Sequence, residues 1–237
     1  MSDGGWEDSA EAWIASLGAD GDFTRRYVTD PAALGRLEGR VFRSALDVGC
    51  GEGRFCRLLR ELGIATTGVD PTRRLIDEAL RCDPAGDYRV GRAEALDFAD
   101  GSFDLVVSYL SLIDIAGLQE AVGEMTRVLE PGGTLLIVNL ASFSTAGAEA
   151  GWIMAADGTR LHFAVDRYLE ERAIPAEWEG IRIVNWHRPL STYLRLLLEQ
   201  GLSLVDFAEP RPIGGSPDDI VDYERAPWAY VMEWRKC

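Results

Sequence analysis

The residues with the clearest chemical potential are Asp47 and the glycines Gly49, Gly51 and Gly53, within the stretch SALDVGCGEGRFCRLL (44–59). The pattern predicts a short apolar strand, a glycine turn and then a helix. Glycines at alternate positions allow a sharp turn and let a ligand lie against bare backbone. The helix would direct unpaired N–H groups and a partial positive charge at that ligand. Such a strand–turn–helix unit predicts a nucleotide-binding site.

Two acids bear on which nucleotide would bind. The dinucleotide fingerprint G-x-G-x-x-G would need a third glycine where the chain has Arg54. Asp47 precedes the glycines instead, and a carboxylate there favours a cation over a pyrophosphate. Asp70 ends a second predicted strand, Ile64 to Val69, and is suited to accept hydrogen bonds from both ribose hydroxyls. NAD enzymes place an acid at the same point, so Asp70 indicates a nucleoside without selecting one.

The D-x-G-x-G-x-G pattern from Asp47 to Gly53 resembles the first motif of the class I S-adenosylmethionine (SAM)-dependent methyltransferases, in particular their small-molecule, type 11-like members. In that family the glycine loop lies under the amino-acid part of SAM, and the first acid helps to hold its ammonium group. The stretch RAEALDFADGSFDLVVS (92–108) resembles the third motif, with Arg92 in place of the frequent Asp at the adenine contact. The resemblance implies SAM as cofactor and S-adenosylhomocysteine as product. The cofactor-binding residues that it implies are Asp47, Gly49, Cys50, Gly51, Asp70, Pro71, Ala93, Glu94, Ser108, Tyr109 and Leu110.

Strands and helices alternate along most of the chain, over about residues 41–140 and 189–234. This order predicts an α/β fold with a doubly wound, Rossmann-like, seven-stranded and mostly parallel sheet. The resemblance to the methyltransferases implies that the last strand is antiparallel. The predicted strands are 44–48, 64–69, 88–90, 103–108, 134–140, 202–207 and 226–234. The segment Pro210 to Arg225 is expected to be an acidic loop between the last two strands.

The predicted domains are an N-terminal helical flap (1–40) and a SAM-binding methyltransferase domain (41–237), which contains a substrate-lid insertion after strand five (141–188). The flap has an amphipathic pattern that fits two interpretations, a helix packed on the edge of the sheet or a cover over the SAM pocket. The residues in it that are candidates to contact ligand are Trp13, Phe23, Arg25 and Tyr27.

The insertion is rich in aromatic residues. Two alternating stretches in it, Leu161 to Tyr168 and Ile181 to Trp186, are expected to pair as antiparallel strands. An aromatic lid favours a small planar or apolar methyl acceptor, stacked against Trp or Tyr. The candidate substrate-binding residues are Tyr109, Trp152 and His187.

Methyl transfer from a sulfonium is an in-line displacement, so the protein mainly has to align the acceptor and exclude water. A base is needed only if the accepting atom holds a proton tightly. His187 is the candidate catalytic residue, with a structural hydrogen-bonding role as the alternative. Asp114 has two interpretations as well, a group that orients or deprotonates the acceptor, or the N-cap of the following helix.

Composition narrows the range of partners. The chain has 237 residues and a net charge of -15, which argues against nucleic acid, anionic membranes and polyanionic substrates. No apolar run is long enough to span a bilayer, and the acidic N-terminus does not resemble a signal peptide, so we expect a cytoplasmic protein. The four cysteines have no metal-type spacing, and no metal site is predicted. We expect a small-molecule substrate and a monomer or homodimer.

Three functions fit these observations. The first is a SAM-dependent methyltransferase acting on an O or N atom of a small, aromatic or planar metabolite. The second is a protein that binds SAM without methyl transfer, or uses it for another reaction. The third is an NAD(P)-dependent dehydrogenase built on a similar sheet.

Overall fold

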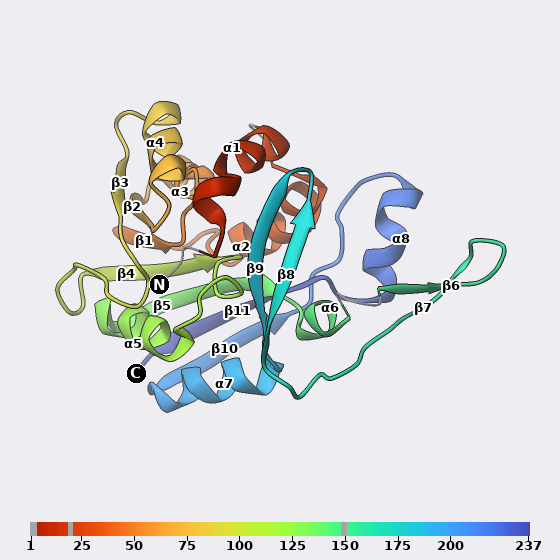
Figure 1. Cartoon of the computed structure of the whole chain (residues 1–237). Helices are drawn as coiled ribbons and strands as arrows, with labels where there is room; N and C mark the ends of the chain where they lie inside the picture. The colour runs from red at the N-terminus through yellow and green to blue at the C-terminus, as the bar shows by residue number, and fades with distance from the viewer. Residues whose placement is uncertain (1–3, 19–20, 148–150) are drawn as a thin grey trace.

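The computed structural model describes residues 4–18, 21–147 and 151–237. Its centre is a seven-stranded sheet in the order β3-β2-β1-β4-β5-β11-β10 (Figure 1). Strand β11 runs antiparallel to both of its neighbours, and the other pairs are parallel. The strands are β1 (Ser44–Val48), β2 (Ala65–Asp70), β3 (Asp87–Val90), β4 (Phe103–Tyr109), β5 (Leu129–Leu140), β10 (Leu202–Ala208) and β11 (Ala229–Lys236). The predicted α/β architecture, with its antiparallel last strand, is confirmed.

Helices cover both faces of the sheet. They are α2 (Asp30–Gly35), α3 (Arg54–Glu61), α4 (Arg73–Cys82), α5 (Leu118–Val128) and α7 (Leu190–Glu199). Helices α5 and α7 supply apolar side chains to one core, and α2 and α3 supply them to the core on the opposite face. Every residue of β4 is buried, with Leu105 and Val107 in the second core and Val106 in the first. A parallel strand covered on both faces has this continuous apolar pattern.

The N-terminal segment lies over one end of the sheet. Helix α1 (Trp6–Leu17) is followed by a π-helical turn, η1 (Arg25–Thr29), which runs into α2. The Ser9 hydroxyl donates to the Arg182 carbonyl and accepts from the Arg182 N–H, and the Val184 N–H donates to the Gly4 carbonyl. These bonds join α1 to a strand of the insertion. Part of the predicted flap, 1–3 and 19–20, lies outside the described residues.

The insertion forms two hairpins, and its predicted strand pairing is wrong. Strand β7 (Arg160–Phe163) pairs with β6 (Trp152–Met154), and β9 (Ile181–His187) pairs with β8 (Arg172–Trp178). Each strand pairs with its sequence neighbour because closing a short loop costs less entropy than closing a long one. Figure 1 shows the β8–β9 hairpin in cyan beside α1. The insertion begins with a short helix, α6 (Ser142–Ala146), and its residues 148–150 lie outside the described part.

The expected loop between the last two strands contains a helix, α8 (Pro217–Arg225). Its first turn has a capping box, in which Ser216 and Asp219 exchange side-chain and backbone hydrogen bonds, and Pro217 occupies the first helical position. These local signals favour a helix start. Within the described part of the chain, no helix is long and apolar enough to cross a membrane.

Candidate active site

A cavity of about 560 Å³ lies where the glycine turn, the ends of β2 and β4, α1 and β9 meet. This is the carboxyl edge of the parallel strands, where open α/β folds bind ligands. Seven acidic side chains and three arginines line it, so its charge favours a cationic ligand. The acids are Asp22, Asp47, Glu52, Asp70, Glu94, Asp114 and Glu179.

The glycine turn is built so that backbone faces this cavity. The Gly49 and Cys50 N–H groups both donate to the Val69 carbonyl, at 2.7 and 3.1 Å, which ties the turn to β2. Gly49 has φ of 80°, and an added Cβ would lie 2.3 Å from the Ser111 Cβ, so no larger residue fits there. Gly51 has φ of 55°, but an added Cβ would meet no atom within 4 Å. Gly51 therefore leaves open the space that a ligand can occupy.

Asp47 is buried at the end of β1 with one carboxylate oxygen unsatisfied. Its Oδ2 accepts a hydrogen bond from the Cys56 thiol at 3.3 Å, whereas no described residue donates to its Oδ1. Burial raises the pKa of Asp47 to about 7, and the nearby carboxylates of Asp70 and Glu52 add to the shift. A buried acceptor without a partner is costly, and a ligand ammonium group would satisfy it.

SAM binding is therefore expected to strengthen as pH rises toward 7. The free protein holds Asp47 partly protonated, whereas the complex with an ammonium group favours the ionised form. Below the raised pKa, affinity should rise by up to about tenfold per pH unit, and above it the affinity should level off. Calorimetry of SAM binding between pH 5.5 and 8.5 measures this dependence. Asp47→Asn should bind SAM weakly with a flatter profile, and an unchanged slope in that variant would assign the dependence to another group.

Asp70 ends β2 and has both oxygens engaged by backbone. The Gly51 N–H donates to Oδ2 at 3.0 Å, and the Thr72 N–H donates to Oδ1 at 2.8 Å. Burial raises the pKa of Asp70, and these two hydrogen bonds oppose the shift. Each carboxylate oxygen has a further lone pair. Asp70 is thus oriented by the turn that it faces and keeps acceptor capacity for a ribose diol.

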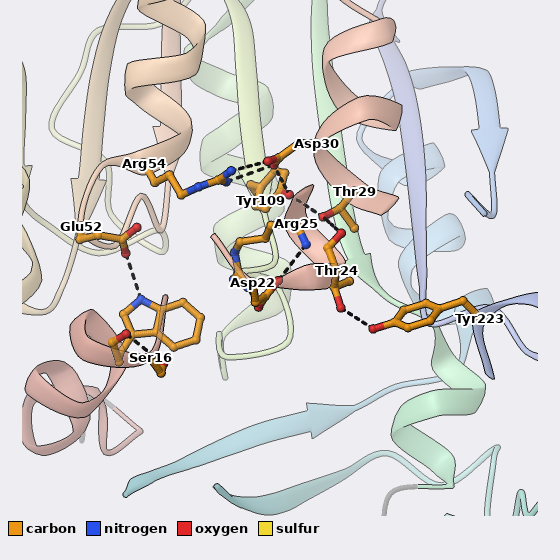
Figure 2. Close-up of polar contacts among 11 residues, drawn as sticks. Ser16, Asp22, Thr24, Arg25, Thr29, Asp30, Glu52, Arg54, Tyr109 and Tyr223 are labelled. Carbon is orange, nitrogen blue, oxygen red and sulfur yellow. Dashed lines mark hydrogen bonds and ion pairs between the residues drawn. The ribbon is translucent and has the colours of Figure 1, made fainter. Parts of the chain in front are cut away.

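The N-terminal segment contributes a polar wall to the cavity. The Trp13 indole N–H donates to the Glu52 Oε2 at 2.9 Å, and the Arg25 guanidinium lies 4.8 Å from the centre of the Trp13 ring. Asp22 accepts from both the N–H and the guanidinium of Arg25 (Figure 2). Of the flap candidates, Trp13 and Arg25 line the cavity. Phe23 instead packs on Tyr27 and Tyr223, away from it.

Tyr109, at the end of β4, is fixed from both sides. Its ring stacks on Phe55 with centroids 4.4 Å apart, and its hydroxyl donates to the Asp30 Oδ1 at 2.6 Å. Asp30 also forms a buried ion pair with Arg54, the first residue of α3 (Figure 2). Burial, with the Asp30 charge adding to it, raises the pKa of the Tyr109 phenol far above its usual value. Tyr109 therefore stays neutral and acts as a wall of the cavity.

The structure brings together ten of the eleven residues implied for cofactor binding. Asp47, Gly49, Cys50, Gly51, Asp70, Pro71, Ala93, Glu94, Tyr109 and Leu110 all line the cavity. Ser108 does not line it, because its hydroxyl lies behind Ser111, with the two oxygens 2.7 Å apart. Leu110 has a positive φ of 56°, a strained conformation of the kind that clusters at functional sites.

The structure does not place the other two substrate candidates in this cavity. His187 is fully buried, with Nδ1 2.7 Å from the Thr145 hydroxyl and Nε2 2.9 Å from the Tyr168 carbonyl oxygen. Both ring nitrogens are therefore engaged in structural hydrogen bonds. Trp152 lies in the β6–β7 hairpin and lines a separate hollow with His162. The periodicity of the insertion did not reveal which of its strands face the core, so these placements could not be read from the pattern.

His187→Ala is expected to lower stability and to leave the pH profile of turnover unchanged. The change removes a fully buried ring and takes one hydrogen bond from the Thr145 hydroxyl, which keeps its bond to the Ser142 carbonyl. It also takes one hydrogen bond from the partly buried Tyr168 carbonyl, and the total cost is about 2–4 kcal/mol in the free energy of unfolding. Urea unfolding and the pH dependence of kcat/KM measure the two effects. A variant of normal stability with a large loss of kcat would restore the catalytic interpretation.

Several cavity residues had no distinct signal in the sequence. Trp6 and Asn185 line the cavity, as does Glu52 between two of the glycines. Glu52 is the only one that motif spacing could have suggested, because it lies within the turn. Asn185 belongs to a strand whose partner was predicted wrongly, and Trp6 reads as one more apolar position of an amphipathic helix.

Comparison with known proteins agrees with this geometry. A family model described as a methyltransferase domain (Methyltransf_11) matches residues 46–137. Malonyl-[acyl-carrier protein] O-methyltransferase from Enterobacter lignolyticus is 34% identical over 64% of this chain, and the match spans 59% of that relative's length. The enzyme of the same name from Salmonella typhimurium is 29% identical over 82% of this chain and 76% of its own length. The crystal structure of an S-adenosylmethionine-dependent methyltransferase from Mesorhizobium loti superposes with a TM-score of 0.80, at 26% identity, over 92% of this chain and all of that one.

Residues 46–137 carry a methyltransferase domain, and the chain has the fold of a SAM-dependent methyltransferase of known structure. The cofactor of this family fits the residues present, since Asp47 offers an unpartnered buried oxygen, Gly51 leaves open space and Asp70 keeps acceptor capacity. Asp47, the glycine turn and Asp70 are the residues that would hold it. These matches confirm the resemblance noted in the sequence and argue against the dehydrogenase interpretation.

Proposed function

We propose that the protein transfers a methyl group from SAM to a carboxylate oxygen of a malonyl-type thioester. The observation that carries the proposal is the name shared by the relatives that align over 64% and 82% of this chain, malonyl-[acyl-carrier protein] O-methyltransferase. A malonyl thioester has one free carboxylate, which is a nucleophile at neutral pH. The acceptor proposed here therefore differs from the aromatic or planar metabolite that the sequence favours.

The absence of a histidine from the cavity lining supports this acceptor. Neither His162 nor His187 is among the described residues that line it. A phenol or alcohol needs a base to remove its proton, whereas a carboxylate oxygen attacks without one. SAM held by Asp47, the glycine turn and Asp70 would supply an activated methyl group for in-line transfer to the acceptor oxygen, with S-adenosylhomocysteine as the leaving product.

The chain's own residues orient the acceptor and exclude water. Tyr109 is rigid because it is stacked on Phe55 and bonded to Asp30, so it presents a fixed wall. Helix α1 and strand β9 close the cavity from the other side through Trp6, Trp13 and Asn185. Holding the accepting oxygen in line with the methyl group supplies much of the rate enhancement for such a displacement.

A second candidate acceptor is a planar molecule methylated on O or N. The observation in its favour is that five of the seven tryptophans line the cavity, namely Trp6, Trp13, Trp178, Trp186 and Trp228. Indole rings bind flat ligands by stacking. They also serve as apolar walls, so this lining is compatible with both acceptors.

Methyl-labelled SAM distinguishes the candidates. We expect label to enter malonyl-CoA or a malonyl-carrier protein as a methyl ester, which alkali releases as methanol. Acetyl-CoA, which lacks the free carboxylate, is the matched control and should take no label. Label found only in alkali-stable methyl groups of phenols or amines would overturn the proposal in favour of the second candidate. Binding of S-adenosylhomocysteine with no labelled product from any acceptor would favour a protein that binds SAM without methyl transfer.

The proposed acceptor has two forms, in which the malonyl group is attached either to coenzyme A or to a carrier protein. The relatives named above act on a carrier-protein-bound group, whereas the sequence favours a small-molecule substrate. Turnover of malonyl-CoA against malonyl-carrier protein, in the same labelling assay, shows which form this chain prefers.

A further inference from the structure

Asp114 lies in the loop between β4 and α5 and lines the cavity. It does not cap α5, because the residue before that helix is Gly117. The helix-cap interpretation of its sequence position is therefore wrong, and its carboxyl group is available to a ligand. Asp114 is not among the residues assigned above to SAM binding.

The loop that carries Asp114 is held rigidly by the end of β9. The Asn185 side-chain amide donates to the Asp114 Oδ1 at 2.6 Å, and the Trp186 N–H donates to the Ile113 carbonyl at 2.6 Å. The Arg188 guanidinium, only 4% exposed, donates to the carbonyls of Leu112, Ile115 and Ala116. This arrangement fixes one oxygen of Asp114, and the side chain lines the cavity together with Trp6.

We infer that Asp114 is a specificity-determining residue for the acceptor, which it contacts as a neutral carboxylic acid that donates a hydrogen bond to the acceptor carboxylate. The inference rests on the proposed function. Asn185 donates to Oδ1, so we assign the proton to Oδ2, from which it is donated to the acceptor carboxylate. No proton is transferred in the methylation step, since the second oxygen of the acceptor carboxylate is the nucleophile.

The surroundings of Asp114 favour its neutral form. Burial raises the pKa of Asp114 to about 8, the Asn185 hydrogen bond opposes the shift, and the charge of Asp70 adds to it. Two charged groups face Asp114, namely Asp70 from the end of β2 and Arg25 from η1. The charge of Arg25 lowers the pKa of Asp114. An acceptor carboxylate at hydrogen-bond distance favours one shared proton, as in other close carboxyl pairs. The positive charge on the sulfur of bound SAM would lower the pKa of Asp114.

The pH profile separates this role from that of a base. If Asp114 donates to a carboxylate, kcat/KM for the acceptor falls as pH rises above about 8, because the ionised form repels the ligand. If Asp114 instead deprotonated a hydroxyl acceptor, kcat/KM would rise over the same range. The two roles therefore predict opposite slopes.

The test compares Asp114→Asn and Asp114→Ala with Asp77→Asn, a matched control on the exposed side of α4. The measurements are kcat/KM for malonyl-CoA between pH 6 and 9, and the Kd of malonyl-CoA for the protein saturated with S-adenosylhomocysteine. An asparagine amide donates a similar hydrogen bond but does not titrate. We expect Asp114→Asn to keep kcat/KM within about threefold at pH 7 and to lose the decline at high pH, whereas Asp114→Ala raises the Kd of malonyl-CoA by about 10–100-fold.

S-Adenosylhomocysteine affinity should stay within about twofold in all three variants, because a hydrogen bond to the acceptor alone does not involve the cofactor. Methyl ester formation that Asp114→Ala leaves unchanged would contradict this inference alone. A rate that rises with pH and disappears in Asp114→Asn would also contradict it. If the unaltered protein forms no ester with any malonyl thioester, the proposed function fails and this inference fails with it.

Discussion

Gly51→Val is expected to reduce SAM affinity by at least about 100-fold while the chain stays folded. The Gly51 backbone faces the cavity, and an added Cβ would meet no atom of the protein within 4 Å. The valine side chain would therefore fill the space that the ligand needs without disturbing the core. A left-handed residue other than glycine costs about 1–2 kcal/mol, and a β-branched one costs more, so some loss of stability is expected as well.

Gly63→Val is the matched control for this experiment. Gly63 has φ of 82°, and an added Cβ there also meets nothing within 4 Å, but it lies beyond the C-terminus of α3 and does not line the cavity. Both variants carry a comparable backbone penalty, so calorimetry with SAM isolates the blocking effect. Gly49→Ala, by contrast, should disrupt packing against Ser111. If Gly51→Val binds SAM as the unaltered protein does, the glycine turn is not the cofactor site.

Asp30→Ala is expected to give the largest loss of stability among single changes around the cavity. Asp30 is 7% exposed, forms an ion pair with Arg54 and accepts a hydrogen bond from Tyr109 (Figure 2). Removing the carboxylate breaks a buried, hydrogen-bonded ion pair with the Arg54 guanidinium, which costs about 3–5 kcal/mol. For a chain of this length that corresponds to a fall in Tm of about 6–20 °C.

The same change should also weaken ligand binding, because Arg54 and Tyr109 both line the cavity. Thermal unfolding with and without S-adenosylhomocysteine separates the two effects. Glu177→Ala is the matched control, since it removes an acid from an exposed pair with Arg182, where the loss should be below about 1 kcal/mol. A fall in Tm for Asp30→Ala no larger than that of the control would show that the ion pair contributes little to the fold.

The cofactor half of the cavity was predictable from sequence because its determinants are local. Asp47 and the three glycines belong to one strand–turn–helix unit, and Asp70 ends the strand that pairs with β1 in parallel register. The carboxyl ends of adjacent parallel strands meet at one edge, so these residues converge without any long-range folding information. The number of strands in the sheet followed from the same alternation of strands and helices, whereas their spatial order comes from the structure.

The insertion was predicted poorly because its pattern did not specify a partner. Alternating apolar and polar residues in Leu161 to Tyr168 and in Ile181 to Trp186 predict that these two stretches pair with each other. In the structure, each stretch pairs with a strand that is nearer in the sequence. As a result, the candidates Trp152 and His187 do not line the cavity in the structure. His187 is instead a buried residue with both ring nitrogens in hydrogen bonds. Alternating side chains indicate a strand but do not say which strand it joins.

The sequence by itself determined the class of fold and the candidate SAM-binding residues, since glycine conformation, strand periodicity and the position of an acid after a strand are properties of short segments. Only the tertiary structure decided the acceptor side. Asp114 and Asn185 are 71 residues apart and lie 2.6 Å from each other through their side chains, and Trp6 from the N-terminal helix lines the same cavity. Contacts between distant segments form only when the whole core has packed, because each requires loop closure that the local sequence does not encode.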